Sequence, residues 1–371
     1  MITFEEPIIE AEEKRLLYEA IKNSSVAQGP YVKKFEQSCS KYFNTKFACA
    51  SFNGTTAMHL ALAALGIKEN DEVIVPSFTF VATANVVSYA NAKPVFADIK
   101  KGTLCIDPED IERKITKKTK AIIPVHVYGN LCDMDAIGKI AKEHSLFVIE
   151  DACEAHGAKY KGKKAGSMSE IGCLSFHSSK IARTGEGGIS LTGSKHLDEN
   201  MKLLRTQGKL KSEDLRGDEI IEKTYYHKVL GFNYRMLDLQ AAIGIAQIKK
   251  IDKNVIAREK IAAAYRDGFK KYEVKTFEAE KGSKPVHWVY PLILKNRGAR
   301  LKVGRELIKN NVPFRSFFWP CHKQPFYNSK DVLPVTENIS ETGIILPCNA
   351  SMNEEEAVML TKMIGSVLEN A

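Results

Sequence analysis

The chain has 371 residues, of which 44% are hydrophobic and 27% charged, a composition that excludes a disordered, collagen-like or coiled-coil protein. Its net charge of +9 comes from scattered bases without interleaved aromatic residues, so it favours anionic small molecules such as phosphates over nucleic acid. No apolar run approaches the ~20 residues that span a bilayer. The acidic residues 1–6 do not form a signal peptide, so we expect a cytoplasmic protein without a membrane partner.

The eight cysteines do not form a metal-binding pattern. None of them belongs to a Cys-x-x-Cys pair, and a chain of this length needs no disulfide staples. We therefore expect reduced thiols and no metal site.

Short apolar runs alternate with helical stretches from about residue 46 to residue 191. The predicted strands are residues 47–50, 72–75, 94–97, 121–125, 146–149, 172–176 and 188–191. The predicted helices are residues 56–65, a helix from about 82, one from about 107, and 133–142. Apolar runs of this length between helices indicate strands buried on both faces of a mostly parallel sheet. A ligand is then expected at the carboxyl ends of these strands.

The pattern changes in the last third of the chain. A long helix is predicted over about 237–265, and it is followed by strand-like residues 286–294 and 312–318 and by helices at 301–310 and 354–368. This order indicates a second, α+β domain. We expect a large domain over residues 1–245, with an N-terminal arm, and a small domain over residues 246–371.

Two familiar phosphate-binding motifs are not met. No Gly-x-Gly-x-x-Gly follows a predicted strand, so a dinucleotide fold has no support. Residues 157–164 have the spacing of a P-loop, but Lys164 stands where Ser or Thr would hold magnesium. We interpret this segment as a β-turn.

A third segment could hold a phosphate. Gly54, Thr55 and Thr56 lie between a predicted strand and a predicted helix. Gly54 allows close approach, and a helix N-terminus offers free N–H groups beside two hydroxyl groups. A plain turn with a threonine N-cap is the alternative, and this segment alone does not decide between them.

Two charged residues follow buried strands. Asp151 ends one of them, where a carboxylate is costly without a charged partner such as a protonated heterocyclic nitrogen. A helix N-cap is the alternative. Lys180 follows the strand at 172–176 and precedes the glycine-rich residues 185–188. A desolvated lysine there could form a Schiff base. A solvated surface charge is the ordinary interpretation of one lysine. The order of the possible phosphate site at 54–56, the strand-end aspartate and this lysine favours Schiff-base formation instead.

Taken together, these motifs resemble the DegT/DnrJ/EryC1/StrS family of pyridoxal phosphate-dependent sugar aminotransferases. The resemblance covers nearly the whole chain, through residues 28–30, 53–57, 76–80, 150–152, 175–177, 180, 185–188, 231–236 and 320–325. It implies fold type I, the aspartate aminotransferase-like α/β fold, with a mostly parallel seven-stranded sheet in the large domain and a smaller C-terminal α+β domain. Residues 231–236 and 320–325 look most like the perosamine synthase branch, which aminates carbon four of a nucleotide-linked 4-keto-6-deoxy sugar.

The resemblance also implies roles for single residues. Lys180 would form the Schiff base with pyridoxal phosphate and then move a proton, and Asp151 would keep the pyridine nitrogen protonated. Phe80 would stack on the ring, with a core aromatic as the alternative. The further cofactor contacts are Gly54, Thr55, Thr56, Glu154, Ser175 and, from the neighbouring subunit of a homodimer, Asn233. The implied substrate contacts are Gly29, His177, Glu186, Arg235 and His322.

The implied reaction is a ping-pong transfer. L-Glutamate would give its amine to the cofactor, and the pyridoxamine phosphate form would aminate carbon four of the nucleotide-linked keto sugar, for surface-polysaccharide or glycan biosynthesis. Lys180 argues against the family's dehydratase branch, where histidine replaces the lysine. No strong candidate for a distal carboxylate clamp is found, which argues against a dicarboxylic keto acid as acceptor.

Other functions remain as alternatives. An enzyme of the same family could act at carbon three or on an amino-ulosonate, because Glu154 leaves the acceptor open. A non-catalytic binding or regulatory relative is disfavoured, since such a protein needs neither Lys180 nor Asp151. A nicotinamide-dependent sugar enzyme is disfavoured by the missing glycine fingerprint.

Overall fold

The computed structural model describes residues 2–4, 9–210 and 215–369. The helices of this part of the chain are α1 (Ala11–Lys22), α2 (Pro30–Phe43), α3 (Gly54–Ala64), α4 (Ala82–Tyr89), α5 (Pro108–Lys114), α6 (Met134–Glu143), α7 (Lys195–Arg205), α8 (Glu219–Glu222), α9 (Asp238–Phe269), α10 (Arg297–Lys309), α11 (Pro334–Thr342) and α12 (Glu354–Glu369). The strands are β1 (Phe47–Ser51), β2 (Glu72–Pro76), β3 (Lys93–Ala97), β4 (Thr119–Ile122), β5 (Phe147–Asp151), β6 (Lys159–Tyr160), β7 (Lys163–Lys164), β8 (Ile171–Ser175), β9 (Gly188–Thr192), β10 (Ser283–Lys284), β11 (Tyr290–Ile293), β12 (Arg315–Ser316) and β13 (Gly343–Leu346).

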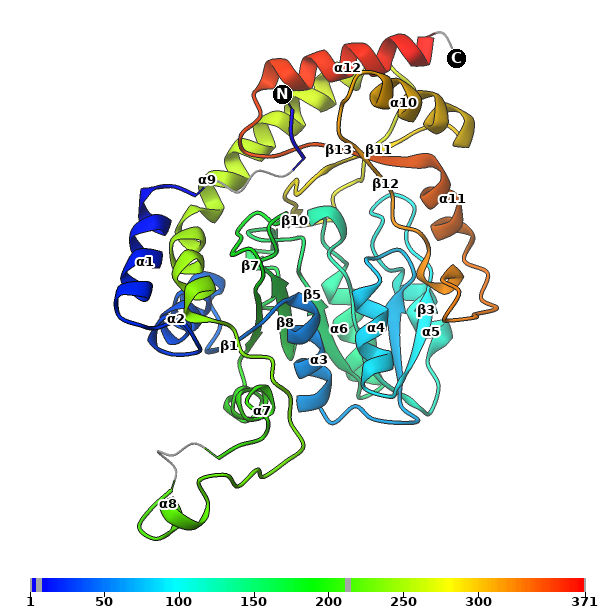
Figure 1. The fold of residues 1–371 in the computed structure, drawn as a ribbon. Coiled ribbons are helices and arrows are strands. Elements are labelled where there is room, and N and C mark those ends of the chain that lie inside the picture. Colours follow the sequence, from blue (N-terminus) through cyan, green and yellow to red (C-terminus); the bar gives the residue numbers. More distant parts are fainter. Residues whose placement is uncertain (1, 5–8, 211–214, 370–371) are drawn as a thin grey trace.

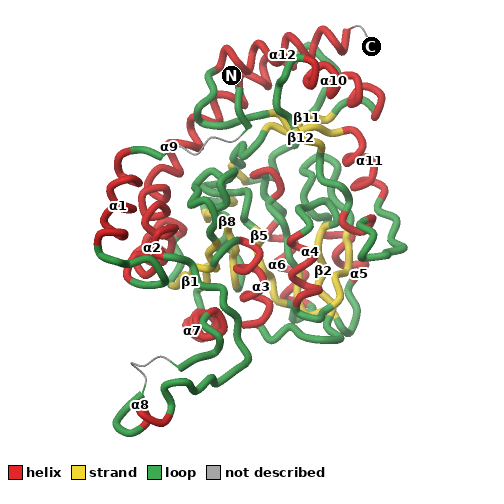
Figure 2. Tube along the Cα trace, viewed as in Figure 1, coloured by secondary structure: helices red, strands yellow, loops and turns green. Residues whose placement is uncertain are grey.

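A seven-stranded sheet forms the centre of the molecule, in the order β1-β9-β8-β5-β4-β2-β3 (Figures 1 and 2). β9 runs antiparallel to both of its neighbours, and the other adjacent pairs are parallel. The mostly parallel α/β sheet is thus confirmed. It brings the carboxyl ends of β5 and β8 to one edge, with Asp151 paired to Cys173.

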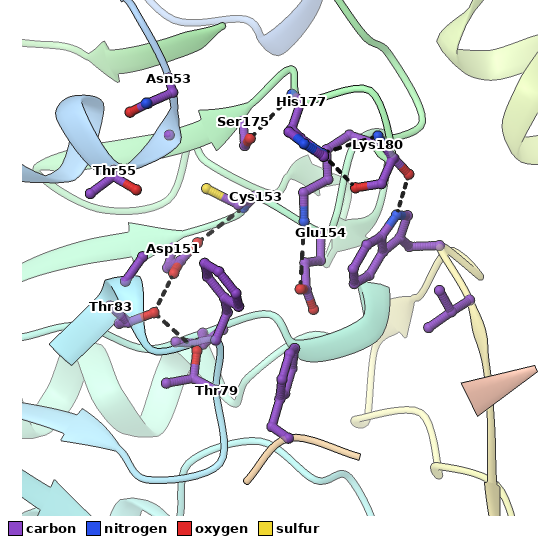
Figure 3. A pocket seen from close by; sticks show the side chains of 18 of the residues that line it. Asn53, Thr55, Thr79, Thr83, Asp151, Cys153, Glu154, Ser175, His177 and Lys180 are labelled. Carbon is purple, nitrogen blue, oxygen red and sulfur yellow. Dashed lines mark hydrogen bonds and ion pairs between the residues drawn. The ribbon is translucent and has the colours of Figure 1, made fainter. Parts of the chain in front are cut away.

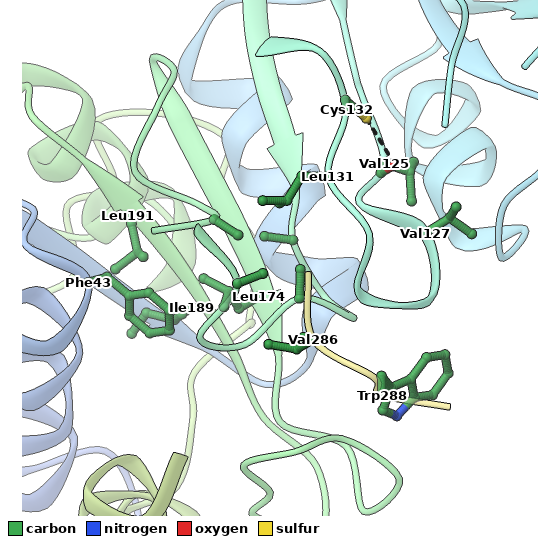
Figure 4. Packing of buried hydrophobic residues seen from close by; sticks show 14 of the residues in the cluster. Phe43, Val125, Val127, Leu131, Cys132, Leu174, Ile189, Leu191, Val286 and Trp288 are labelled. Atoms are coloured by element: carbon green, nitrogen blue, oxygen red, sulfur yellow. Dashed lines mark hydrogen bonds between the residues drawn. The ribbon is translucent and has the colours of Figure 1, made fainter. Parts of the chain in front are cut away.

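Both faces of the sheet are buried, as the continuous apolar runs indicate. Successive residues of β2 separate onto the two faces: Ile74 joins a core that includes α2, α6 and α9, whereas Val73 and Val75 join a core with α3 and α4. Figure 4 shows part of the first core, where Leu174 and Ile189 of the sheet pack near Phe43 of α2. This packing fixes the strand ends that form the site.

The C-terminal part forms a smaller sheet of its own. β13 pairs antiparallel with both β11 and β12, and α10 and α12 pack nearby. α9 connects the two sheets as one unbroken helix of 32 residues, about 48 Å long at 1.5 Å per residue (Figure 1). It packs on α1 and α2 near its start and on α12 near its end. The helix runs without a break through residue 245, where we expected the large domain to end.

Several elements differ from the prediction. The strands predicted over 286–294 and 312–318 shorten to β11 and β12, because the flanking residues line a cavity or pack as irregular chain. α1, α2, α7, α11 and β13 were not predicted. The turn predicted at 157–164 is confirmed as the hairpin of β6 and β7, with Lys161 and Gly162 in the left-handed region. Among the described residues, no helix is long and apolar enough to cross a membrane.

Candidate active site

A cavity of about 640 Å³ lies where the carboxyl ends of β5 and β8 meet the C-terminal part of the chain. The first turn of α3 and the loop before α4 line one side of it. Residues 288–289 and 315–319 line the other side. The volume is within the usual range for a small-molecule site, and the position agrees with the expectation for an open α/β sheet.

Lys180 reaches into this cavity from the loop between β8 and β9 (Figure 3). A turn in which the Lys180 N–H donates to the carbonyl of His177, at 2.9 Å, sets its backbone. Its Nζ lies 3.5 Å from Glu154 Oε1 and 3.8 Å from the centre of the Trp288 ring. The lysine side chain is only 12% exposed, so its amine lies in the cavity and not on the open surface.

Glu154 is a buried carboxylate beside this amine. Its Oε2 accepts a hydrogen bond from the backbone N–H of Tyr128 at 2.8 Å. Burial raises the pKa of Glu154, while Lys180 and the Tyr128 N–H act in the opposite direction. Glu154 therefore holds a proton more readily than an exposed glutamate does.

Asp151 ends β5 and faces the same cavity. Its Oδ2 accepts from the Thr83 hydroxyl at 2.8 Å, and its Oδ1 accepts from the Cys153 N–H at 3.2 Å. Within the described part of the chain, no basic side chain lies within 4.0 Å of this buried carboxylate. A buried carboxylate supported only by neutral donors is suited to a cationic ligand atom.

The first turn of α3 points free N–H groups into the cavity. The Thr56 N–H is bound by the Asn53 side chain at 2.9 Å, and the Ala57 N–H by the Asn53 carbonyl at 3.0 Å. The first N–H groups of a helix have no partner within the helix, so those of Gly54 and Thr55 remain for a ligand. Ser175, at the end of β8, lines the cavity beside them. This arrangement at a helix N-terminus is suited to binding an anion.

Aromatic and polar residues complete the wall. The Phe80 ring is 60% exposed, lines the cavity, and lies 6.5 Å from the ring of Phe318. An exposed ring at this place differs from a core aromatic. His177 and Glu186 also line the cavity, and His177 Nε2 lies 3.9 Å from Glu186 Oε1.

Comparison with known proteins identifies the family. The profile of the DegT/DnrJ/EryC1/StrS aminotransferase family matches residues 7–364. The chain belongs to this family. It is a pyridoxal phosphate-dependent aminotransferase with the fold that the resemblance implied.

Individual relatives of this aminotransferase span almost its whole length. GDP-perosamine synthase of Escherichia coli O157:H7 is 36% identical over 97% of this chain and 96% of its own length. UDP-4-amino-4,6-dideoxy-N-acetyl-beta-L-altrosamine transaminase of Campylobacter jejuni is 33% identical over 100% of this chain and 98% of its own. The crystal structure of S. venezuelae DesV in complex with a ketimine intermediate has a TM-score of 0.90 at 28% identity, covering 97% of this chain and 95% of that one.

The residues of the cavity fit pyridoxal phosphate. The open N–H groups of Gly54 and Thr55 suit its phosphate, and the Asp151 carboxylate suits its protonated ring nitrogen. Lys180 Nζ is an amine within the same cavity, as Schiff-base formation requires. No group of three or more potential metal ligands is found among the described residues.

Five of the implied contacts of this aminotransferase do not line the cavity of the single chain: Gly29, Thr56, Asn233, Arg235 and His322. Thr56 exchanges hydrogen bonds with Asn53 within the helix cap, so its hydroxyl is committed there. The Gly29 N–H donates to Asp238 Oδ1 at 2.9 Å, and Gly29 is the N-cap residue of α2. Asn233 and Arg235 are exposed and bind each other at 2.9 Å, in the segment that follows α8.

His322 was expected to contact substrate, but it does not line the cavity of the single chain. The ring is buried; its Nδ1 lies 2.7 Å from the Ser77 hydroxyl and its Nε2 lies 3.2 Å from Glu337 Oε1. Burial lowers the pKa of His322, although Glu337 partly opposes the effect. Both ring nitrogens have partners, so His322 joins the 320–325 segment to Ser77, which follows β2, and to α11.

Sequence reasoning missed the contribution of the C-terminal part to the cavity. Arg315, Phe318 and Trp319 line it from β12 and the segment after it, and Trp288 lines it from the segment before β11. Arg315 adds a second cationic side chain to the cavity. It is far from Lys180 in sequence, but both residues line the same cavity. The run of aromatic residues 317–319 was the available signal, but only the three-dimensional fold shows that it lines the same cavity as Lys180.

Proposed function

We propose that this aminotransferase transfers the amine of L-glutamate to carbon four of a nucleotide-linked 4-keto-6-deoxy sugar. The observation that carries the proposal is the meeting of Lys180, Asp151 and the open N-terminus of α3 in one cavity. The similarity to GDP-perosamine synthase over 97% of the chain supports a sugar of this kind as acceptor. A net charge of +9 suits a diphosphate-linked substrate.

The cofactor, when bound, supplies a carbon that carries the amino group and a ring that accepts electrons. The Gly54 and Thr55 N–H groups and Ser175 would hold its phosphate, and Phe80 would pack on its ring. Asp151, supported by Thr83 and the Cys153 N–H, would hold a proton on the ring nitrogen. These contacts fix the position of the cofactor before any substrate enters.

Lys180 is the proposed acid and base of the reaction. Its Nζ would take the proton that leaves the α-carbon of the amino donor and return a proton during amination of the acceptor. Glu154 lies 3.5 Å from this amine, and burial raises its pKa, so it retains a proton more readily than an exposed carboxylate does. Phe80, Phe318 and Trp288 line the same cavity, and with a ligand bound their rings would limit the access of water to the amine.

Asn233 and Arg235 fit the proposal only as residues of a homodimer. They are exposed and lie outside the cavity of their own chain. The nearby segment carries exposed apolar side chains that a second copy would cover, among them Ile221, Tyr225 and Leu230. We propose that Asn233 reaches the phosphate of the neighbouring subunit, so that each dimer has two shared sites.

A second acceptor is favoured by a specific observation. The Campylobacter transaminase, whose name specifies a UDP-linked amino sugar, is 33% identical over the whole chain. A UDP-linked keto sugar, or amination at another carbon, is therefore the alternative within the same chemistry.

The test is an assay of the purified enzyme with L-glutamate and a panel of GDP-, UDP- and dTDP-linked keto sugars. We expect 2-oxoglutarate and a 4-amino sugar, identified by mass spectrometry and by NMR of the aminated carbon. Mixing Lys180→Ala with Asn233→Ala subunits should restore activity that neither variant has alone. Amination of a free sugar or simple aldehyde but of no nucleotide sugar would reduce the proposal to the transaminase class, and failure of the mixed subunits to complement would remove the shared site.

A further inference from the structure

The indole ring of Trp288 lies against the amine of the lysine on which the proposed chemistry depends. Lys180 Nζ is 3.8 Å from the ring centre, well within the range in which a tryptophan face attracts an ammonium group. We propose that Trp288 is a positioning residue that holds the Lys180 amine in place during proton transfer. This inference rests on the proposed role of Lys180 and extends it to a residue of the C-terminal part.

The same ring also holds the backbone of the lysine loop. The indole N–H of Trp288 donates to the carbonyl of Ser179 at 2.7 Å, and Ser179 directly precedes Lys180. Trp288 therefore contacts both ends of the lysine, its tip and its attachment to the chain. A flexible side chain fixed at both ends has few orientations left, which is the condition for a well-placed acid and base.

Trp288 is itself rigidly supported. Its carbonyl accepts from Arg258 Nη1 at 2.6 Å, and the buried Arg258, in α9, also donates to the carbonyl of Cys348. Two residues earlier, the Val286 N–H donates to the Gly129 carbonyl at 3.0 Å. The ring is only 7% exposed and belongs to the first hydrophobic core (Figure 4). It is thus a fixed platform and not a mobile lid.

Glu154 and Trp288 constrain the amine in different ways. Glu154 attracts the charge from 3.5 Å and also accepts a hydrogen bond from the Tyr128 N–H. Trp288 offers an apolar face that attracts the ammonium without competing for its protons. The amine therefore remains free to give or take a proton on its remaining side.

The chain offers a matched control. It contains two tryptophans, and both line this cavity. Trp319 is 65% exposed, whereas Trp288 is buried against the lysine. Trp288→Leu and Trp319→Leu thus remove the same side chain from the same cavity, with and without the contact to Lys180. Trp288→Phe keeps a ring face but loses the N–H that binds Ser179.

The first measurement concerns geometry and uses the cofactor-free protein. NMR of protein labelled with ¹³C at the lysine side chains reports the ε-methylene protons, and Lys180→Arg identifies the signal of Lys180. A tryptophan face shifts protons above it upfield. We expect an upfield Lys180 signal in the wild type and in Trp319→Leu, a smaller shift in Trp288→Phe, and none in Trp288→Leu.

The second measurement concerns the proton transfer. Single-turnover reaction of the loaded enzyme with L-glutamate is followed by visible absorbance, with glutamate and with glutamate deuterated at the α-carbon. We expect Trp288→Leu to slow the reaction about ten- to a hundredfold, as for a catalytic group displaced by about 1 Å. The isotope effect should rise, because proton transfer becomes the slow step. Trp288→Phe should lie between Trp288→Leu and the wild type, and Trp319→Leu should change the isotope effect less than Trp288→Leu does.

The outcomes separate this inference from the proposed function. An unshifted Lys180 signal in the wild type, or an unchanged isotope effect in Trp288→Leu, would overturn the positioning role. Equal effects in Trp319→Leu would also overturn it, since they would show a general loss of packing. If the wild type does not react with glutamate, the proposed donor fails, and the NMR comparison still decides the contact. Trp288→Met replaces the leucine variant if that variant does not fold.

Discussion

A methyl group at position 54 would collide with the end of β8. A Cβ built on Gly54 lies 2.8 Å from Ser175 Cβ and 3.1 Å from Cys153 Sγ, whereas ordinary contact begins at 3.4 Å. Ser175 is paired with Gly188 in the sheet, so it cannot retreat easily. In Gly54→Ala the first turn of α3 must therefore move by about 0.6 Å, and its free N–H groups move with it.

This movement predicts a weaker affinity for pyridoxal phosphate, through the hydrogen bonds that the helix N–H groups make with the phosphate group. A shift of this size takes a hydrogen bond of about 2.9 Å out of its favourable range. A hydrogen bond to a charged group is worth about 1.5–3 kcal/mol. We expect Gly54→Ala to bind pyridoxal phosphate about 10- to 150-fold more weakly, at 1.4 kcal/mol per factor of ten. The overpacking should also lower the stability of the cofactor-free protein by about 1–3 kcal/mol.

The assay is an absorbance titration of cofactor-free protein with pyridoxal phosphate and, separately, with pyridoxal. Gly138→Ala is the control, because a Cβ there, inside α6, meets nothing within 4 Å. We expect it to keep wild-type affinity. The reasoning is refuted if Gly54→Ala binds pyridoxal phosphate as the wild type does, or if it loses pyridoxal to the same extent, since the phosphate would then not lie at this helix N-terminus.

Three further predictions concern other parts of the molecule. Lys180→Ala should fold but lose turnover by orders of magnitude, and full transaminase activity in this variant would remove Lys180 from the chemistry. Asp98→Ala should lower the free energy of unfolding by about 2–3 kcal/mol in urea denaturation, because Asp98 accepts from the N–H groups of Val335 and Thr336 and from the Thr336 hydroxyl at the start of α11; an unchanged midpoint contradicts this. Glu259 has a pKa lowered to about 2, chiefly by its hydrogen bond with His287. Its stabilisation is therefore complete above the ordinary value of 4.5 and is lost as the pH falls from 4.5 towards 2. Glu259→Gln should cost about 1–2 kcal/mol at pH 7, after allowance for its partial exposure, and a difference from the wild type that stays constant down to pH 2 would contradict the assignment.

The central sheet could be predicted from the sequence because its strands are buried on both sides. A run such as that of β2 must be apolar at every position, and this continuous pattern is easily recognised. The helices α1, α2 and α7 were harder, since their charged faces dilute the apolar pattern. Even so, Gly29-Pro30 at the start of α2 and Ser194, which caps α7, were signals that could have been used.

The candidate site could be predicted where it depends on strand ends. Asp151 and Lys180 follow buried strands, and parallel pairing necessarily brings such positions to one edge of a sheet. Residues from distant segments could not be placed in this way. The resemblance implied a substrate contact for His322, but it could not show that Ser77 and Glu337, each far away in sequence, bind the two ring nitrogens in the single chain. Trp288 and Arg315 line the cavity because β11 and β12 both pair with β13, a strand that the sequence pattern did not indicate.

The placement of the two tryptophans makes the protein's own ultraviolet emission an optical report on its active site. Since both indoles of the chain line this cavity, all of its tryptophan emission comes from the site. The two rings differ in environment: Trp288 is 7% exposed and Trp319 is 65% exposed, so the first emits at shorter wavelength and the second is open to soluble quenchers such as acrylamide. A ligand near Trp288 changes the emission at shorter wavelength. A ligand that covers Trp319 shields the emission at longer wavelength from the quencher. Entry of a small ligand and of a larger one can therefore be followed separately, in unmodified protein and in real time.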